Sequence, residues 1–421
     1  MTRRNYSSRQ SARPFGADRV SSAVRTTLAV LLYAAAAAAQ PATLSLNDAI
    51  ARALEANRTI LAARSARAID SAGIRVAAQR PNPEVSVEAE RETPHWAFAG
   101  TVPLEISGKR QRRIDVANAT LAVTEAETAR ITADVRADVR RAYYQAVASL
   151  RRVTIAQELE TIAARARDAA QDRFQTGAAP RLEALQAGLV LAQAQNDVTA
   201  ARGEVAAARA ELNALLAYPL DSSPALADPL EAGPLPTAAA ATAQTLGGNA
   251  ELDVLQKRID EERARVALAK ALRRPDPSVT GTLTYDAPGE FTFGWRAAAA
   301  VALPIFTTGR PEIAVAEATL IRATADRDAR IAQIGGAVTA ALARATAARQ
   351  TVERYQAAIL PASLEVEQMA DESYRAGQTG LPAYLQTLQA ARDVRQRALQ
   401  AGLDYQLALA DLERAMGSAL K

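Results

Sequence analysis

The residue types that most often do chemistry are scarce in this chain. Its 421 residues include one histidine, His95, three methionines and no cysteine. Without cysteine there is no thiolate nucleophile, disulfide, cysteine-ligated metal site or lipid-bearing N-terminal cysteine. One histidine beside an expected turn is typical of a surface position and cannot supply a triad or a histidine acid–base pair. Gly247-Gly248-Asn249 lacks the spacing of a phosphate-binding loop. The sequence therefore predicts no enzyme, and no catalytic, metal-ligating or cofactor-binding residue.

The charged residues indicate helix surfaces rather than a reactive site or a nucleic-acid footprint. Carboxylates such as Asp134 and Asp138 stand three or four residues from arginines, as in exposed ion pairs of about 0.3–0.5 kcal/mol each. The first 39 residues hold six arginines and one aspartate, whereas residues 40–421 hold 44 basic and 45 acidic residues. The basic excess lies outside the body of the chain, so we expect no nucleic-acid partner.

The N-terminus has the pattern of a secretory signal peptide. Arginines up to Arg25 precede a 14-residue apolar run, 26–39, which ends in small residues before Gln40. A transmembrane anchor is the alternative, but that run is shorter than the ~20 residues that a spanning helix needs. We expect cleavage after residue 39 and a mature chain without a lipid.

The rest of the chain is a duplication. Four motifs occur twice in the same order, at offsets of 194, 201, 200 and 200 residues. Five prolines between the halves indicate an extended linker. The predicted organisation is a signal peptide (1–39), a first repeat (40–218, with a β-hairpin at about 83–106), a Pro/Ala-rich linker (219–243) and a second repeat (244–421, with a β-hairpin at about 277–304).

Each repeat should contain a very long helix. The 68 residues from Lys109 to Thr176 include neither Gly nor Pro, and apolar residues recur every three or four positions. An unbroken helix of that length would measure about 100 Å, which is typical of coiled coils or tubes. In the second repeat we expect Gly335-Gly336 and Pro361 to bend or break the corresponding helix.

The hairpins have the dimensions of transmembrane β-strands. Residues 279–285 and 291–303 alternate strictly and are joined by a turn at 286–290. In the first repeat the strands at 84–90 and 97–106 are weaker, because Glu88, Glu90 and Glu105 require a lumen or rim position. Strands of about 9–11 residues match a membrane barrel.

Four strands cannot close a barrel, and lipid does not tolerate open sheet edges. If the hairpins enter a membrane, several chains must share one barrel that continues into long helices. The alternative is a soluble periplasmic coiled-coil protein, structural or adaptor, with two small β-hairpins. Adaptors usually carry one helical hairpin, whereas this chain repeats it, which favours the conduit.

The order of several motifs over some 370 residues resembles the TolC-like outer membrane efflux protein family. These motifs are the start at 44–57, Pro-Asn-Pro at 81–83 and the two aromatic-x-x-Gly turns at 174–177 and 374–377. The resemblance implies a mainly α fold with a small β part, in which duplicated long α-helical hairpins form a trimeric α-barrel continuous with a 12-stranded β-barrel, four strands per chain. It further implies a homotrimer in the outer membrane of a Gram-negative-type envelope, in contact with its lipid and with a large periplasmic part.

The same resemblance implies the function and the partners. The chain would be the exit channel of a tripartite efflux system, which passively conducts cargo from an inner-membrane pump of the RND type through a periplasmic adaptor (membrane fusion) protein. No cofactor is implied.

A segment from Pro103 to Arg113 is similar to the Leu-Glu-x-Gly-Gly-Lys-Arg segment of the cobalt–zinc–cadmium (CzcC-like) branch, with Ser107 in place of the first glycine. That similarity implies divalent heavy-metal ions as cargo; drug or solvent efflux and type I secretion remain the alternatives. The alternative without a functional role is that Gly108-Lys109-Arg110 only ends the strand, and that the two basic side chains are solvated at the start of the next helix.

The expected functional sites are at the two helix–helix turns. The resemblance implies that these turns form the periplasmic tip, which contacts the adaptor and narrows to a gate. Acidic residues six and nine positions after the turn glycine can ring the aperture in TolC-like proteins. Of the matching positions only Glu183 is acidic, so we expect a weak gate of three Glu183 side chains with Arg181 and Arg375 as partners. The candidates are, for the tip and adaptor contact, Phe174, Gly177, Tyr374 and Gly377, and for the aperture, Glu183, Gln186 and Gln386.

Overall fold

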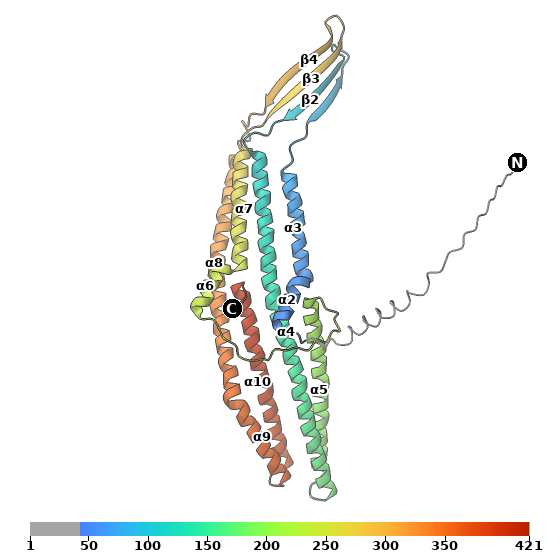
Figure 1. Ribbon diagram of the computed structural model, residues 1–421, viewed down its shortest axis with the longest axis vertical. Coiled ribbons are helices and arrows are strands. Elements are labelled where there is room, and N and C mark those ends of the chain that lie inside the picture. Colours follow the sequence, from blue (N-terminus) through green and yellow to red (C-terminus); the bar gives the residue numbers. More distant parts are fainter. Residues whose placement is uncertain (1–42, 421) are drawn as a thin grey trace, which may run out of the picture. The chain divides into compact units, whose positions relative to one another are not determined.

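The structure is a computed structural model that describes residues 43–420 (Figure 1). The expected signal peptide, 1–39, lies outside these residues. The described residues fall into two units. The small unit comprises residues 43–44 and 224–226, where Leu44 and Leu226 form a parallel bridge and the Leu44 N–H donates to the Ala225 carbonyl at 2.7 Å. All that follows concerns the large unit, residues 45–223 and 227–420.

The large unit is mainly helical. Local capping fixes where several helices begin: Ser45 and Asp48 form a capping box at α2, and the side chains of Asn57 and Asn249 accept from the first N–H groups of α3 and α7. The helices are α2 (Leu46–Ala56), α3 (Arg58–Ala77), α4 (Lys109–Gln175), α5 (Arg181–Leu216), α6 (Ala238–Gly248), α7 (Ala250–Leu272), α8 (Arg310–Arg354), α9 (Leu360–Arg375) and α10 (Leu381–Met416).

The predicted long helix is present as α4, which is continuous over 67 residues and about 100 Å. It is the element that the other helices share, since α3, α5, α7 and α10 all pack on it. Many of its buried residues are alanines, and their small side chains let neighbouring helices approach closely.

The expectation for the second repeat was half wrong. The helix α8 continues through Gly335-Gly336 without a break, because neighbouring turns and packing outweigh the roughly 1 kcal/mol that each glycine costs. The irregularity lies instead at Tyr355–Ile359, a π-helical turn just before Pro361. Since Pro361 has no N–H to donate, the backbone re-pairs over a wider turn, and the Leu360 N–H donates to the Tyr355 carbonyl.

The two hairpins form one antiparallel sheet in the order β1-β2-β3-β4. The central pair, β2 with β3, joins the two repeats. Both edges, β1 and β4, are unpaired within the described chain. The strands are β1 (Glu84–Ala89), β2 (Trp96–Pro103), β3 (Pro277–Ala287) and β4 (Phe291–Val301).

Buried tyrosines hold the connection between the repeats against the helices. The Tyr143 hydroxyl, on α4, donates to the Asp228 carboxylate at 2.8 Å, and the Tyr405 hydroxyl, on α10, donates to the Gly233 carbonyl at 2.7 Å. Both tyrosines are fully buried. The connection is shorter than the expected 219–243, because α6 already begins at Ala238.

Candidate functional site

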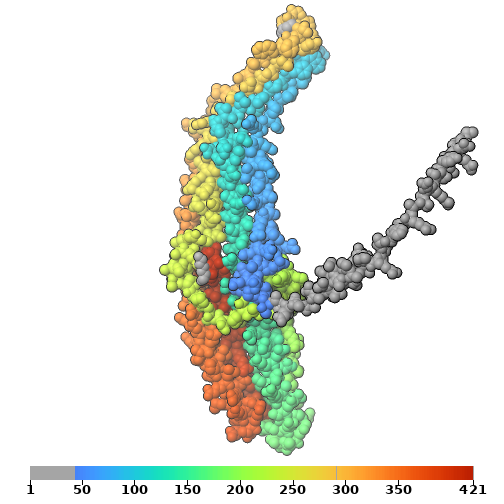
Figure 2. All heavy atoms as spheres, in the orientation of Figure 1, coloured from blue at the N-terminus to red at the C-terminus, as the bar shows by residue number. Residues whose placement is uncertain are grey.

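The two helical turns are built in the same way and lie at the end of the helices opposite to the sheet (Figures 1 and 2). Gly177 and Gly377 have φ values of +78° and +71°, a conformation that only glycine adopts freely. In each turn the residue after the glycine donates its N–H back to the last turn of the helix, from Ala178 to the Arg173 carbonyl and from Gln378 to the Ser373 carbonyl. The predicted reversal of the chain at both glycines is therefore present.

The two tip aromatics occupy different environments. The Phe174 side chain is exposed (39%), whereas Tyr374 is buried (4%). The Tyr374 ring stacks on that of Tyr384 with centroids 4.7 Å apart and planes at 5°. Alanines of the first hairpin (α4 and α5) pack with this pair and with leucines of α10, so the two hairpins pack together near their turns; the cluster contains Ala166, Ala170, Ala187, Tyr374, Leu381, Tyr384 and Leu388.

Glu183 connects the hairpins. The Tyr374 hydroxyl donates to the Glu183 carboxylate at 3.3 Å, and the Arg173 guanidinium lies 3.5 Å from the same oxygen. The guanidinium carbon of Arg173 also lies 5.5 Å from the centre of the Tyr374 ring, within the range of a cation–π contact. Arg173, Glu183 and Tyr374 are called the tip triad below.

The structure gives Glu183 a partner that the sequence did not suggest. Within the chain, Arg375 pairs with Asp371 at 2.9 Å rather than with Glu183, and no ion pair of Arg181 is found among residues 43–420. Asp371 also accepts from the Tyr384 hydroxyl at 2.9 Å. The signal that could have found Arg173 was its place one residue before Phe174, on the last turn of α4.

Burial keeps the two tip tyrosines protonated. It raises the pKa of the Tyr374 hydroxyl, and the negative charge of Glu183 raises it further. Burial and the hydrogen bond to Asp371 likewise raise the pKa of Tyr384. Both hydroxyls are therefore neutral donors at physiological pH, which is the form that the bonds to the two carboxylates require.

The remaining aperture candidates are solvated. Gln186 and Gln386 are exposed, and neither side chain has a hydrogen bond within the described part of the chain. Glu183, by contrast, keeps only 13% of its side-chain surface exposed. Of the three predicted aperture residues, one is thus tied into the hairpin contact and two are free to face water or another chain.

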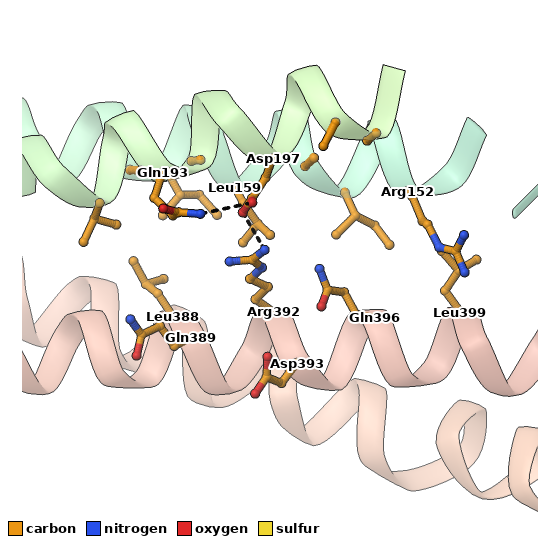
Figure 3. Close-up of a pocket in the computed structure, with 18 of the residues that line it drawn as sticks. Arg152, Leu159, Gln193, Asp197, Leu388, Gln389, Arg392, Asp393, Gln396 and Leu399 are labelled. Carbon is orange, nitrogen blue, oxygen red and sulfur yellow. Dashed lines mark hydrogen bonds and ion pairs between the residues drawn. The ribbon is translucent and has the colours of Figure 1, made fainter. Parts of the chain in front are cut away.

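Above the tip, a groove of about 620 Å³ runs between α4, α5 and α10 (Figure 3). Its floor is apolar and includes Ile155 and Leu159 of α4, and its sides carry polar residues of α5 and α10. Arg392 of α10 reaches across to the Asp197 carboxylate of α5, as Figure 3 shows. The groove therefore combines an apolar floor with polar sides, and the Arg392–Asp197 ion pair spans it.

At the other end of α4, basic residues fasten the strands to the helices. Lys109 is buried (6% exposed), and its Nζ lies 2.8 Å from the carboxylate of Asp276, which precedes β3. Arg110 donates to the Ala78 carbonyl at the end of α3, and Arg113 donates to Glu105. The interpretation of Lys109-Arg110 as a solvated pair was wrong for Lys109, because an acidic partner from the other repeat lies opposite it, whereas Arg110 is exposed.

Within residues 43–420, no group of three or more His, Cys, Asp or Glu side chains is arranged to hold a metal ion. In the same residues, every helix is too short or too polar to pass through a bilayer.

The sequence matches a protein family and a curated relative. The pattern of the family described as "Outer membrane efflux protein" matches residues 49–217 and 242–418. Among curated proteins, the cobalt–zinc–cadmium resistance protein CzcC of Cupriavidus metallidurans is 28% identical over 245 residues. That alignment covers 56% of this chain and 57% of the relative, so the chain spans little more than half the length of that protein.

Solved structures share the fold. Crystal structures of CusC, described as forming a transmembrane channel, superimpose with a TM-score of 0.73 and 18% identity, over 89% of this chain and 92% of that one. The CmeC outer membrane channel of Campylobacter jejuni gives 0.72 and 16%, over 88% and 85%. At this identity the likeness concerns the fold alone.

Proposed function

Because the chain belongs to the outer membrane efflux protein family, we propose that it is the exit channel of a tripartite efflux system, through which cargo leaves passively after an inner-membrane pump and a periplasmic adaptor have delivered it. The observation that carries the proposal is that the sheet and both halves of the helical part each end in two uncovered outer elements, one on either side.

In the sheet and in both halves of the helical part, one outer element comes from the first repeat and the other from the second. The sheet ends in β1 and β4. In the half of the helices next to the sheet, the neighbours are α3, α4, α7 and α8, with α3 and α8 outermost. In the half next to the turns, they are α5, α4, α10 and α9, with α5 and α9 outermost. The first repeat thus supplies one edge throughout, and the second repeat supplies the other.

Large apolar side chains are exposed along the outermost helices. A single chain in water would gain by covering them. Each is more than half exposed: Ile69 and Val76 on α3, Val315 and Ile321 on α8, Leu182, Leu185 and Leu189 on α5, and Leu364, Val366 and Met369 on α9.

Copies joined head to tail would cover these edges. The edge of the first repeat on one copy meets the edge of the second repeat on the next, and a ring of such contacts leaves no edge open. Three copies, the number that the family resemblance implies, would make a barrel of twelve strands.

The two faces of the sheet support a barrel in lipid. In the register, Trp96, Tyr285 and Phe293 form one cross-strand row, and Phe98, Leu283 and Trp295 form the next. The opposite face carries threonines, glutamates and Arg296. An apolar face with an aromatic row near the turns suits lipid, and the polar face suits a water-filled lumen.

At the tip, we propose that the tip triad holds the channel closed. It ties the second hairpin to the first in each copy, and releasing it would let the hairpins part. The turns, with Phe174 exposed beside Gly177 and the second turn at Gly377, are the proposed adaptor contact, and the groove of Figure 3 offers an apolar surface next to them.

Divalent heavy-metal ions are the cargo that we propose. The support is the similarity to CzcC, which is described as a cobalt–zinc–cadmium resistance protein, together with the Pro103–Arg113 segment. The pump specific to that cargo would be of the RND type. The alternatives to this cargo are drugs or solvents and secreted proteins, and the experiment below distinguishes them.

Two experiments test the channel and the cargo separately. The full chain, purified from membranes in detergent, should resist extraction by salt, run as a heat-modifiable trimer and conduct ions in planar bilayers. A monomer that stays in the soluble fraction contradicts the channel. A strain lacking the gene should become sensitive to cobalt, zinc or cadmium salts; sensitivity to drugs alone would contradict the cargo but leave the channel intact.

A further inference from the structure

The two open edges of the sheet carry opposite charges on the same face. Arg296 is the only charged residue of β4, and it is exposed. In the register, Arg296 pairs with Thr282, Thr282 with Ala99, and Ala99 with Ser86 of β1. Directly paired residues share a face, so Arg296 lies on the face of Ser86 and of the residues two positions away, Glu84 and Glu88.

These charges cannot meet within one chain. Neighbouring strands are ~4.8 Å apart, so β1 and β4 are separated by about 14 Å across the sheet. Among residues 43–420, no ion pair is formed by Arg296, Glu84 or Glu88. Glu90, just past the end of β1, continues the same alternation, and its backbone N–H donates to the His95 carbonyl. Glu84, Glu88 and Glu90 are called the acidic edge below.

We propose that Arg296 of one copy forms an ion pair with the acidic edge of the next copy, where β4 meets β1 in the assembled barrel. This rests on the proposed function, because it requires that the sheet closes with further copies of this chain. The pairs lie on the polar face, towards the lumen. The long arginine side chain reaches the residue opposite and its diagonal neighbours, and the stagger of the barrel selects the carboxylate.

The pair would decide which edges join. An unpaired edge can add any strand, including its own counterpart from another copy. Contact of β1 with β1 would bring two acidic edges together, and contact of β4 with β4 would bring two Arg296 side chains together; like charges opposite each other destabilise a strand pair. Only contact of β4 with β1 unites opposite charges. The charges thus favour a closed ring over a two-fold dimer.

Charge reversal tests the proposal. In the full chain, Arg296→Glu should lower the fraction of heat-resistant trimer about tenfold, because all seams of the ring change together. Arg296→Glu is then combined with Glu84→Arg, Glu88→Arg or Glu90→Arg. The trimer should recover only in the one or two double variants in which the second change replaces a carboxylate that faces Arg296. The matched control is Arg91→Glu, an equal charge change in the turn beyond β1. No loss with Arg296→Glu, or a loss that none of the three second changes restores, overturns the proposal.

Cross-linking supplies a readout that does not depend on stability. The chain has no cysteine, so Arg296→Cys combined with a cysteine at 84, 88 or 90 leaves one thiol pair per seam. Oxidation should give covalent trimers for one or two of these pairs. If the unaltered chain forms conducting trimers and none of the three pairs cross-links, the seam pair is wrong and the channel stands. If the unaltered chain forms no trimer, the proposed function itself fails.

Discussion

At the scale of residues, one carboxylate and one phenol connect the two helical hairpins near their turns. Glu183 belongs to α5 and Tyr374 to α9, and the hydroxyl of Tyr374 donates to the carboxylate. Arg173 balances the charge from α4. The contact is polar but largely shielded from water, since Glu183 keeps only 13% of its side-chain surface exposed. We therefore expect it to hold in the closed channel and to open when a partner protein competes for these side chains.

Tyr374→Phe removes this hydroxyl and leaves the stacked ring. We expect a loss of stability of no more than about 0.5–1.5 kcal/mol and a higher conductance of the trimer in planar bilayers, since the hairpins lose their polar link. Phe174→Leu, at the exposed position of the other turn, is the control and should leave the closed conductance unchanged. Equal conductance of Tyr374→Phe and the unaltered chain would argue against the proposal that the tip triad holds the channel closed.

Lys109→Met tests the ion pair at the start of α4. The change leaves the Asp276 carboxylate without its ion-pair partner, although the Ile106 N–H still donates to it. Because Asp276 is also 30% exposed, we expect a cost of about 1–3 kcal/mol rather than that of a fully buried charge. The thermal midpoint of the trimer in detergent measures it. Adding Asp276→Asn should recover much of the loss; a midpoint unchanged by Lys109→Met would show that the pair contributes nothing.

At the scale of elements, the junction between strands and helices depends on charge. Arg113 donates to Glu105 and to the Gln79 carbonyl, and so joins the segment after β2 to the end of α3. The hydrogen bond from Arg113 holds the pKa of Glu105 below its usual value of 4.5.

This junction should weaken in acid. A carboxylate whose pKa is lowered in the folded chain stabilises the fold above its unfolded pKa, near 4.5, and the stabilisation is lost as the pH falls through the lower folded value. The difference in thermal midpoint between the unaltered chain and Arg113→Met should therefore be larger at pH 7 than at pH 3. A difference that stays constant or grows in acid contradicts the assignment.

At the scale of the whole molecule, a single chain leaves apolar edges uncovered, and assembly should cover them. Ile321 on α8 is 70% exposed. Ile321→Asp should therefore prevent trimers while leaving the helix content of the chain unchanged, as measured by native electrophoresis and circular dichroism. Arg322→Asp, at the next position, where the side chain is 83% exposed, is the control and should assemble. Normal trimers of Ile321→Asp would place α8 outside the interface.

The sequence by itself determined the periodic elements. A 68-residue stretch without Gly or Pro has no reason to stop being helical, so α4 was predictable almost to the residue. Alternation in β3 and β4 set their faces, and the glycines at 177 and 377 marked the turns because other residues rarely adopt positive φ. The order of the motifs along the chain also indicates the family.

Only the tertiary structure decided which distant residues meet. Arg173 and Glu183, or Lys109 and Asp276, are ordinary charged residues in sequence, and nothing local distinguishes them from the solvated arginines around them. The glycine pair in α8 shows the same limit, since packing overrides a weak local preference. Periodicity is a property of neighbours along the chain, whereas partners are chosen by the packing of whole helices and strands, and this is why the elements were foreseen and their partners were not.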